Sequence, residues 1–384
     1  MTNVVSFPDR VRGFAPARLI EARVALQASR DELGRAVGLT GQAIGYYETG
    51  ARRPDMEKLL SIAAALRQPV TFFLREGRPM PATTGTRFFR SIGPKSNKLN
   101  ASLDVKTKWL WEVVDRIGKL VRLPEVKLPS VDRSPGATSY SDEEIAQIAT
   151  ATRRLWGLGD GPIANVIALL ETNGIIVSRY EMGSDKIDAF SCWVDGRPLI
   201  LLGSDKESAC RSRFDAAHEV GHIILHHGAA QEDLNDKRIR DRLEEEAHRF
   251  ASEFLFPRNM FLIEFYSTRA AHLQGLKRRW GMSMQAIAHY AKVLGAIDDS
   301  QYVLFRKTVT KNRWLREEPL DREIPMEQPK MLLKAIKMLV DRGALPPSGL
   351  ESENGFSLEM VQRLCGELPA ALAPVGPSLT LLSS

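Results

Sequence analysis

The sequence predicts a multidomain protein with an all-α N-terminal domain, an α+β domain that holds a small three-stranded sheet, and a helical C-terminal region. Three observations predict this. The 384 residues suffice for two or three domains, each with its own core. Apolar residues recur at helical spacing over 15–75 and 205–295. Between them, residues 174–202 form short segments rich in β-branched and aromatic residues, which is typical of strands.

The composition excludes several classes of protein. Hydrophobic residues make up 43% and charged residues 26%, which argues against an intrinsically disordered chain. The three cysteines, Cys192, Cys210 and Cys365, are far apart and show no CxxC spacing, so we expect neither a disulfide framework nor a cysteine metal site. We see no signal peptide and no apolar run of about 18–20 residues. We therefore expect a cytoplasmic protein with no membrane partner.

The charge is mildly basic and concentrated near the N-terminus. The formal net charge is +6, and residues 1–75 hold 11 Lys and Arg against 7 Asp and Glu. This balance permits binding to nucleic acid without requiring it.

The predicted domain order follows from composition shifts along the chain. Residues 1–75, with five short helical patterns, form the first domain, and 76–140 form a linker with one helix at 101–121. Residues 141–315 form the α+β domain, and 316–384 the helical C-terminal region.

Inside the α+β domain, helices are predicted from Ser141 and from Pro162, followed by three strands over 174–202. The helical pattern over 205–295 breaks at Gly228, Pro257 and Gly281, and residues 296–315 are expected to add a strand or a loop. Two amphipathic helices are predicted after residue 328, in PKMLLKAIKMLVDRG and SLEMVQRLCGEL.

Two short helices joined by a glycine turn are predicted within residues 29–48. Ser29 and Thr40 are suited to cap them, Gly38 permits the turn, and Ile44 faces the core. Ala36 is small, as a helix contact requires. This arrangement places the second helix in the major groove of DNA in helix-turn-helix proteins.

The segment LTGQAIGYYETGARRPDMEKLLSIAAAL resembles the Xre/Cro family of helix-turn-helix domains over about 60 residues. The resemblance implies double-stranded DNA as a partner. It implies base contacts from Gly41, Gln42 and Tyr46, phosphate contacts from Arg30, Arg52 and Arg53, and a place for the capping residue Thr40 in the DNA-binding site. Gly41 has no side chain, and Arg30 replaces the family's usual Gln, so the resemblance does not predict which operator sequence is bound. The alternative is a helical bundle without a DNA partner.

The segment AAHEVGHIILHH carries a metal-binding pattern. His218 and His222 are four residues apart on one predicted helix, so both project from the same face and can hold one ion. Glu219 is placed to act as the base toward an attacking water. A metzincin would need Gly and His where Leu225 and Gly228 stand, so that class is excluded.

A third ligand is available on a later helix, in EEEAHRFASEFLFP. Glu244 and His248 are four residues apart and share a face of that helix. Glu245 is the alternative ligand if the helical phase differs by one residue.

Residues 141–315 resemble the ImmA/IrrE family of metallopeptidases, chiefly through these two segments. The resemblance implies a gluzincin-like site with Glu219 as general acid/base and three ligands: His218, His222 and Glu244. This ligand set suits Zn²⁺, and Mn²⁺ or another divalent ion is the alternative.

The two resemblances together imply a DNA-binding transcriptional regulator whose endopeptidase domain cleaves a protein substrate, namely a repressor, an antitoxin or the chain itself. The alternative is a transcription factor or toxin–antitoxin-type regulator whose peptidase-like domain is a sensor or interaction module without catalysis. A homodimer on a two-fold operator is compatible with both.

Four residues around the motif have open roles. His226 and His227 are expected to be surface histidines. His248 is expected either beside the ligands or on the plain helix surface, and His248 and Tyr266 are candidates to stabilise an oxyanion. One edge of the sheet is expected to bind substrate in extended form.

Overall fold

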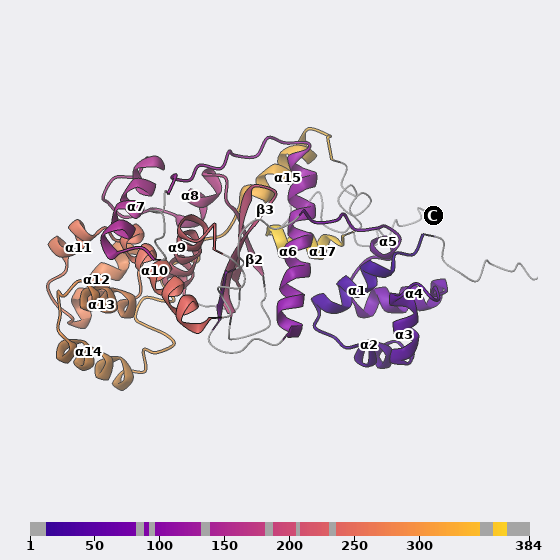
Figure 1. The fold of residues 1–384 in the computed structure, drawn as a ribbon, viewed down its shortest axis with the longest axis horizontal. Helices are drawn as coiled ribbons and strands as arrows, with labels where there is room; N and C mark the ends of the chain where they lie inside the picture. Colours follow the sequence, from indigo (N-terminus) through magenta and orange to yellow (C-terminus); the bar gives the residue numbers. More distant parts are fainter. Residues whose placement is uncertain are drawn as a thin grey trace, which may run out of the picture. The chain divides into compact units, whose positions relative to one another are not determined.

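The computed structural model describes eight stretches of the chain: residues 13–81, 88–91, 97–131, 139–180, 187–204, 208–229, 236–345 and 356–366. These fall into two compact units (Figure 1). The first unit takes its residues from 1–80, 94–122 and 330–384, and the second from 81–93 and 123–329.

The first unit begins with five short helices, as the spacing over 15–75 predicts. They are α1 (Pro16–Ala25), α2 (Arg30–Ala36), α3 (Gly41–Glu48), α4 (Met56–Ala65) and α5 (Val70–Phe73). Ser29, Thr40 and Asp55 cap α2, α3 and α4, since each side chain accepts a hydrogen bond from a backbone N–H of the first turn. The apolar faces meet around Leu19 and Ile44, both fully buried.

The α2–α3 turn depends on two glycines. Gly38 has φ of +68°, which favours glycine, as the sequence predicts. The small residue at the helix contact is Gly34, because a Cβ there would lie 2.7 Å from the carbonyl oxygen of Leu39. The prediction that Ala36 fills this role is wrong, since Ala36 is exposed. Helical spacing alone did not show which small residue faces the turn.

Three further helices complete the first unit: α6 (Asn97–Gly118), α15 (Met331–Asp341) and α17 (Leu358–Cys365). Trp109 of α6 is buried, with its ring 5.5 Å from Phe72 and 6.0 Å from Phe356. Arg18 of α1 bonds Glu112 of α6 at 2.6 Å. The segment predicted as a linker helix and the C-terminal helices thus pack with the helix-turn-helix region.

The second unit holds a four-stranded sheet with the order β1-β3-β4-β2. The strands predicted over 174–202 are β2 (Ile176–Tyr180), β3 (Ile187–Val194) and β4 (Arg197–Gly203). β2 runs parallel to β4, and β3 is antiparallel to it. Asp195 and Gly196, both at positive φ, make the tight β3–β4 turn. The fourth strand, β1 (Phe88–Ser91), comes from the predicted linker and pairs antiparallel with β3.

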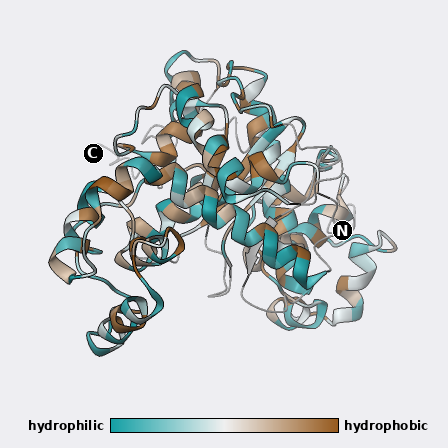
Figure 2. Cartoon of the chain, turned by 60° about the vertical axis from the view of Figure 1, so that its left-hand side comes forward, coloured by the Kyte–Doolittle hydropathy of each residue, from teal (hydrophilic) through white to brown (hydrophobic). Residues whose placement is uncertain are grey.

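The described residues of the second unit also form eight helices: α7 (Asp142–Leu155), α8 (Val166–Thr172), α9 (Ala209–Leu225), α10 (Lys237–Leu255), α11 (Arg258–Glu264), α12 (Ala270–Trp280), α13 (Met284–Val293) and α14 (Asp299–Lys311). Helix α9 packs against β3 and β4, and α10 packs against α9 and α7. Many helices carry hydrophobic and hydrophilic residues side by side, as expected when one face is buried (Figure 2).

The prediction of a strand or a loop over 296–315 is wrong, because α14 occupies most of this segment. Asp298 and Gln301 form a reciprocal capping box at its start. Phe305 and Val309, four residues apart, are both buried and hold the helix to the core. Among the described residues, no helix is long and apolar enough to cross a membrane.

Candidate metal centre

Two helices position the metal-binding residues. Helix α9 begins at a cap from Ser208 and is buried along nearly its whole length. It lies close to α10, because a Cβ on Gly221 would come within 3.0 Å of the Cα of Ala247. This close approach brings the acidic turn of α10 next to the histidine face of α9.

The structure brings His218, His222 and Glu244 together. The two histidine Nε2 atoms lie 3.0 Å apart. Carboxylate oxygens of Glu244 lie 3.3 Å from the Nε2 of His218 and 3.6 Å from that of His222. A tetrahedral zinc ion with bonds of about 2.0–2.2 Å would hold its ligand atoms roughly 3.3–3.5 Å apart. The donor types suit zinc, the two separations to Glu244 match this range to within about 0.1 Å, and the separation of the two histidine nitrogens is about 0.3 Å shorter.

The charge of Glu244 suits a ligand as well. Burial by itself would raise the pKa of this carboxyl, but hydrogen bonds with His218 and His222 outweigh it and hold the pKa below its ordinary value. About a third of the side chain, 32%, is exposed. The carboxylate is therefore ionised at neutral pH, as metal ligation requires.

Three consecutive glutamates of α10 have three different surroundings. Glu244 joins the histidine pair, and no other group of metal-ligand side chains in the described residues is as close together. Glu245 lines the neighbouring cavity. Glu246 is buried and bonds to His226 at 2.9 Å. The geometry thus favours Glu244 over the alternative Glu245.

Glu219 lies fully buried next to the ligand pair. One of its carboxylate oxygens accepts a hydrogen bond of 2.6 Å from the hydroxyl of Ser191 on β3. This contact fixes the orientation of the carboxylate.

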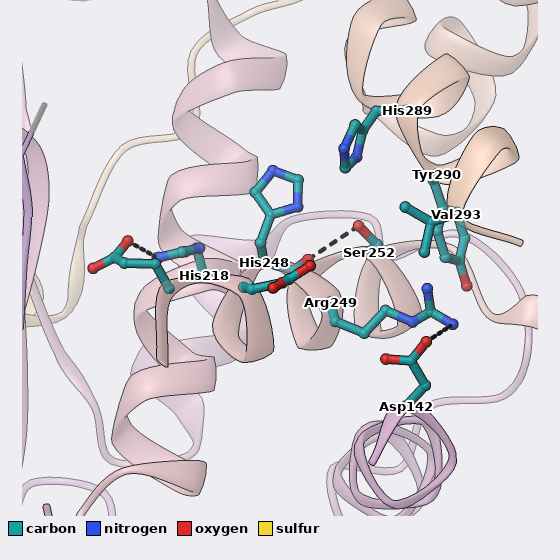
Figure 3. A pocket seen from close by; sticks show the side chains of 10 residues that line it. Asp142, His218, His248, Arg249, Ser252, His289, Tyr290 and Val293 are labelled. Carbon is teal, nitrogen blue, oxygen red and sulfur yellow. Dashed lines mark hydrogen bonds and ion pairs between the residues drawn. The ribbon is translucent and has the colours of Figure 1, made fainter. Parts of the chain in front are cut away.

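A cavity of about 430 Å³ opens beside the site (Figure 3). Its lining includes His218, Glu244, His248, Arg249 and His289. A second cavity of about 340 Å³ shares His248 and His289 with the first. The ring centroids of these two histidines are 5.3 Å apart. Burial lowers the pKa of His289, which keeps its ring neutral at neutral pH.

The remaining predicted residues differ in burial and in whether they line a cavity. His248 lines both cavities, so it is not plain helix surface. Tyr266 is 80% exposed, stacks on His272 and lines neither cavity. His227 is exposed beside Trp193, as expected. The prediction that His226 is a surface residue is wrong: it is buried between His222 and Glu246, because the two helices approach closely there.

The predicted DNA-contact residues of α3 form an exposed face. Gln42 and Tyr46 are exposed and bond to each other at 2.9 Å. Arg52 lies over the ring of Tyr46, 4.9 Å from its centroid, and Arg53 is exposed beside it. These side chains make one polar, cationic surface.

The other three predicted DNA-contact residues have contacts within the domain. Thr40 caps α3. Gly41 packs against Asp31, whose carboxylate would have to move if this position carried a Cβ, since the two would be 1.8 Å apart. Arg30 pairs with the buried Glu48 at 2.6 Å while half of its side chain stays exposed.

Two family models match parts of the chain. The model described as the IrrE N-terminal-like domain matches residues 170–292, and the helix-turn-helix model matches residues 19–73. The chain joins a helix-turn-helix domain to an IrrE N-terminal-like domain. The three ligand candidates and Glu219 all fall within the IrrE-like domain, and Gln42, Tyr46, Arg52 and Arg53 within the helix-turn-helix domain. No curated protein matches the chain.

Two contacts of the IrrE-like domain, those of Ser191 and His226, were not predicted from the sequence. The alternation of β3 held a signal for Ser191, which is in phase with Ala189, a core residue. His226 follows His222 by four residues, so it lies on the ligand face of α9. Only its contact with Glu246 on α10 shows what it does.

Proposed function

We propose that the IrrE-like domain is a zinc-dependent endopeptidase and that the helix-turn-helix domain directs it to DNA as a transcriptional regulator. The observation that supports catalysis most strongly is the combination of three convergent ligand atoms, a buried carboxylate beside them and an adjoining cavity. A purely structural zinc site is closed by four protein ligands, whereas the described part of the chain brings three together here. Zn²⁺ fits best, with Mn²⁺ as the alternative.

His218, His222 and Glu244 would hold the ion, which when bound supplies a Lewis acid beside the scissile carbonyl. Glu219 acts as general base and then as general acid: it takes a proton from the attacking water and delivers it to the leaving amine. The hydroxyl of Ser191 holds one oxygen of Glu219. His248 and His289, both in the cavity lining, are the side chains we propose for stabilising the oxyanion.

The substrate we propose is an extended stretch of protein, bound along β3. Among the described strands, β1 pairs with the edge of β3 that β4 leaves open, and Phe88 of β1 is in register with Ser191. An extended segment paired with this edge would therefore lie directly beside Ser191, the residue of β3 that contacts Glu219. The chain's own β1 occupies this position, so a repressor or antitoxin segment would bind there by β-addition only in place of β1.

The DNA partner follows from the exposed face of α3. We propose that Gln42 and Tyr46 contact bases while Arg52, Arg53 and the exposed part of Arg30 contact phosphates. We propose no membrane partner, and a DNA target is consistent with the cytoplasmic location that we expect. A homodimer would bind half-sites about one helical turn apart.

The first test is elemental analysis of the purified chain and of the His218→Ala/His222→Ala variant. We expect about one zinc per wild-type chain and none in the double variant. Absence of metal from both, even after zinc loading, would exclude the proposed peptidase and favour a regulator whose IrrE-like domain acts without catalysis.

The second test separates catalysis from binding. In Glu219→Gln, the carboxamide cannot take up the water's proton, so we expect cleavage of the protein substrate to fall by at least about 10²-fold. Zinc content and DNA affinity should stay at wild-type levels. Candidate repressors, antitoxins and the chain itself are incubated with both proteins, and fragments are identified by mass spectrometry. Equal cleavage by both proteins would rule out Glu219 as the base.

A further inference from the structure

A chain of hydrogen bonds leads from one metal-ligand candidate into the protein interior. The Nδ1 atoms of His222 and His226 lie 2.9 Å apart, and the Nε2 of His226 lies 2.9 Å from a carboxylate oxygen of Glu246. The side chains of both histidines are fully buried, and that of Glu246 is 5% exposed. Solvent therefore does not compete for these bonds.

Further contacts hold the end of this chain in place. The other carboxylate oxygen of Glu246 accepts a hydrogen bond from the backbone N–H of Tyr140, and Arg242 lies 3.8 Å from the same oxygen. The hydroxyl of Tyr140 donates to the carbonyl oxygen of Leu225, the last residue of α9. Residues from α9, α10 and the segment before α7 thus meet around Glu246.

The donors and acceptors allow one assignment that suits metal binding. An ionised Glu246 is only an acceptor, so the Nε2 of His226 carries the proton of that bond. In a neutral His226, Nδ1 is then an acceptor, and the Nδ1–H of His222 donates to it. The Nε2 of His222 is left unprotonated, with its lone pair facing His218 and Glu244. The opposite polarity would place a proton on the ligand nitrogen and block coordination.

We propose that His226 and Glu246 are positioning residues that hold His222 in its metal-binding tautomer and ring orientation. This inference rests on the proposed zinc site. It gives a function to the third histidine of the HxxxHxxxH spacing and to the third carboxylate of the acidic turn, neither of which would contact the metal or the substrate.

The test measures zinc affinity by competition with a chromophoric chelator. His226→Phe keeps a ring of similar size and removes both hydrogen bonds, and we expect zinc to bind about 10–100-fold more weakly. Glu246→Ala should give a similar loss. Glu246→Gln keeps an acceptor oxygen for His226 and should recover part of the affinity. His227→Phe, at the exposed neighbouring position, is the matched control and should bind zinc as the wild type does.

A second readout separates positioning from mere loss of packing. The chain has seven histidines, so ¹⁵N-histidine spectra can be assigned with single variants. In the zinc-loaded wild type we expect His222 to be protonated at Nδ1, with a hydrogen-bonded proton that is lost in His226→Phe. Urea unfolding of each zinc-free variant checks that the second unit, which holds His226 and Glu246, is folded.

Two results would overturn the inference, and they distinguish a failure of the positioning role from a failure of the zinc site. If His226→Phe and Glu246→Ala bind zinc within twofold of the wild type, the positioning role is wrong while the zinc site stands. If the wild type binds no zinc, the proposed function fails and the positioning role fails with it.

Discussion

At the scale of single residues, three neighbouring glutamates of α10 show how one step along a helix changes the chemistry of a carboxylate. Glu244 faces the histidine pair, Glu245 faces the cavity and Glu246 faces His226. Successive residues of an α-helix are about 100° apart, so neighbours point to different surroundings. The identity of the third ligand therefore depends on helical phase and not on residue type.

This distinction predicts the outcome of two alanine substitutions. Glu244→Ala removes a ligand atom, so we expect zinc content to fall well below one ion per chain and chelator competition to show at least about 100-fold weaker binding. Glu245→Ala is the matched control, with the same loss of charge one residue away, and should retain zinc. Greater loss in Glu245→Ala would mean that the phase of α10 at the site is wrong.

The close backbone contact at Gly34 in the helix-turn-helix domain gives a second prediction at the scale of single residues. In Gly34→Ala the new methyl group would meet the backbone of Leu39, so the turn must shift, and we expect a loss of about 1–3 kcal/mol. Gly45→Ala is the control, because its nearest atoms are 3.8 Å away and belong to the side chain of Arg30. The measurement is the urea concentration that abolishes half of the helical signal assigned to this unit. Equal midpoints for the two variants would contradict the close contact at Gly34.

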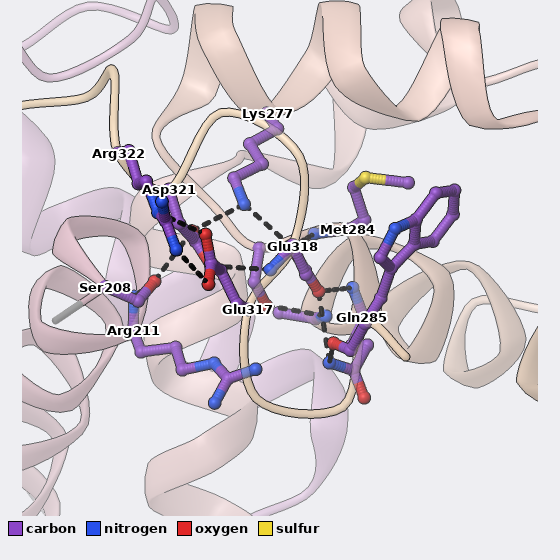
Figure 4. A network of polar contacts seen from close by, with 12 residues as sticks. Ser208, Arg211, Lys277, Met284, Gln285, Glu317, Glu318, Asp321 and Arg322 are labelled. Atoms are coloured by element: carbon purple, nitrogen blue, oxygen red, sulfur yellow. Dashed lines mark hydrogen bonds and ion pairs between the residues drawn. The ribbon is translucent and has the colours of Figure 1, made fainter. Parts of the chain in front are cut away.

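At the scale of elements, a buried ion cluster ties the segment after α14 to α9, α12 and α13 (Figure 4). Lys277 of α12 is fully buried and contacts Glu318 at 2.9 Å and Asp321 at 2.7 Å. Asp321 also accepts a hydrogen bond from Ser208, the cap of α9. Glu318 accepts backbone bonds at the start of α13. The cluster thus links the N-terminal ends of α9 and α13 to α12.

Breaking this cluster from one side should be costly. Lys277→Met leaves two buried carboxylates without their cation, and we expect the second unit to lose about 3–5 kcal/mol of stability. Lys277→Met/Glu318→Gln/Asp321→Asn removes the uncompensated charges and should regain part of the loss. Urea unfolding of the zinc-free proteins provides the comparison. A single variant as stable as the wild type would show that the cluster contributes no net stability.

The same cluster predicts a direction for the effect of pH. Burial alone would raise the pKa of Asp321, but its bonds from Lys277 and the Glu318 backbone hold the pKa below its ordinary value of 3.8. A lowered folded-state pKa means that the unfolded chain binds the proton more tightly. The contribution of ionised Asp321 to the stability of the folded protein is therefore present above pH 3.8, and it is lost as the pH falls through the folded-state pKa. Asp321→Asn should unfold with a weaker dependence on pH in this acid range.

At the scale of the whole molecule, the proposed DNA-contact face lies in the first unit and the candidate metal centre in the second. The DNA-contact face includes Arg52 and Arg53, both exposed. Each phosphate contact releases a bound counterion, so affinity for DNA should fall steeply as salt concentration rises.

This gives a prediction that does not involve the metal. Arg52→Ala and Arg53→Ala should each weaken binding across DNA sequences and reduce the slope of log affinity against log salt by about one. Glu219→Gln should leave this slope unchanged, because its site lies in the other unit. Fluorescence anisotropy with a labelled duplex measures it. An affinity indifferent to salt would remove the DNA assignment for this face.

Much of the molecule was predictable from the sequence because its signals are local. Capping residues and helical spacing predict the five N-terminal helices, and alternation predicts β2, β3 and β4. Four-residue spacing places His218 and His222 on one face, and the acidic turn supplies Glu244. The capping box at Asp298 also marks the start of α14, but the prediction of a strand or a loop overlooked it.

What the tertiary structure alone decided is which faces meet. β1 joined the sheet, and α6, α15 and α17 joined the first unit, because distant apolar surfaces packed together. Ser191 met Glu219, and His226 met Glu246, for the same reason. The periods of helix and strand determine the direction of each side chain from its neighbours in sequence. Contacts between residues far apart depend on the packing of whole surfaces, such as the approach of α9 to α10 at Gly221, which no local pattern encodes.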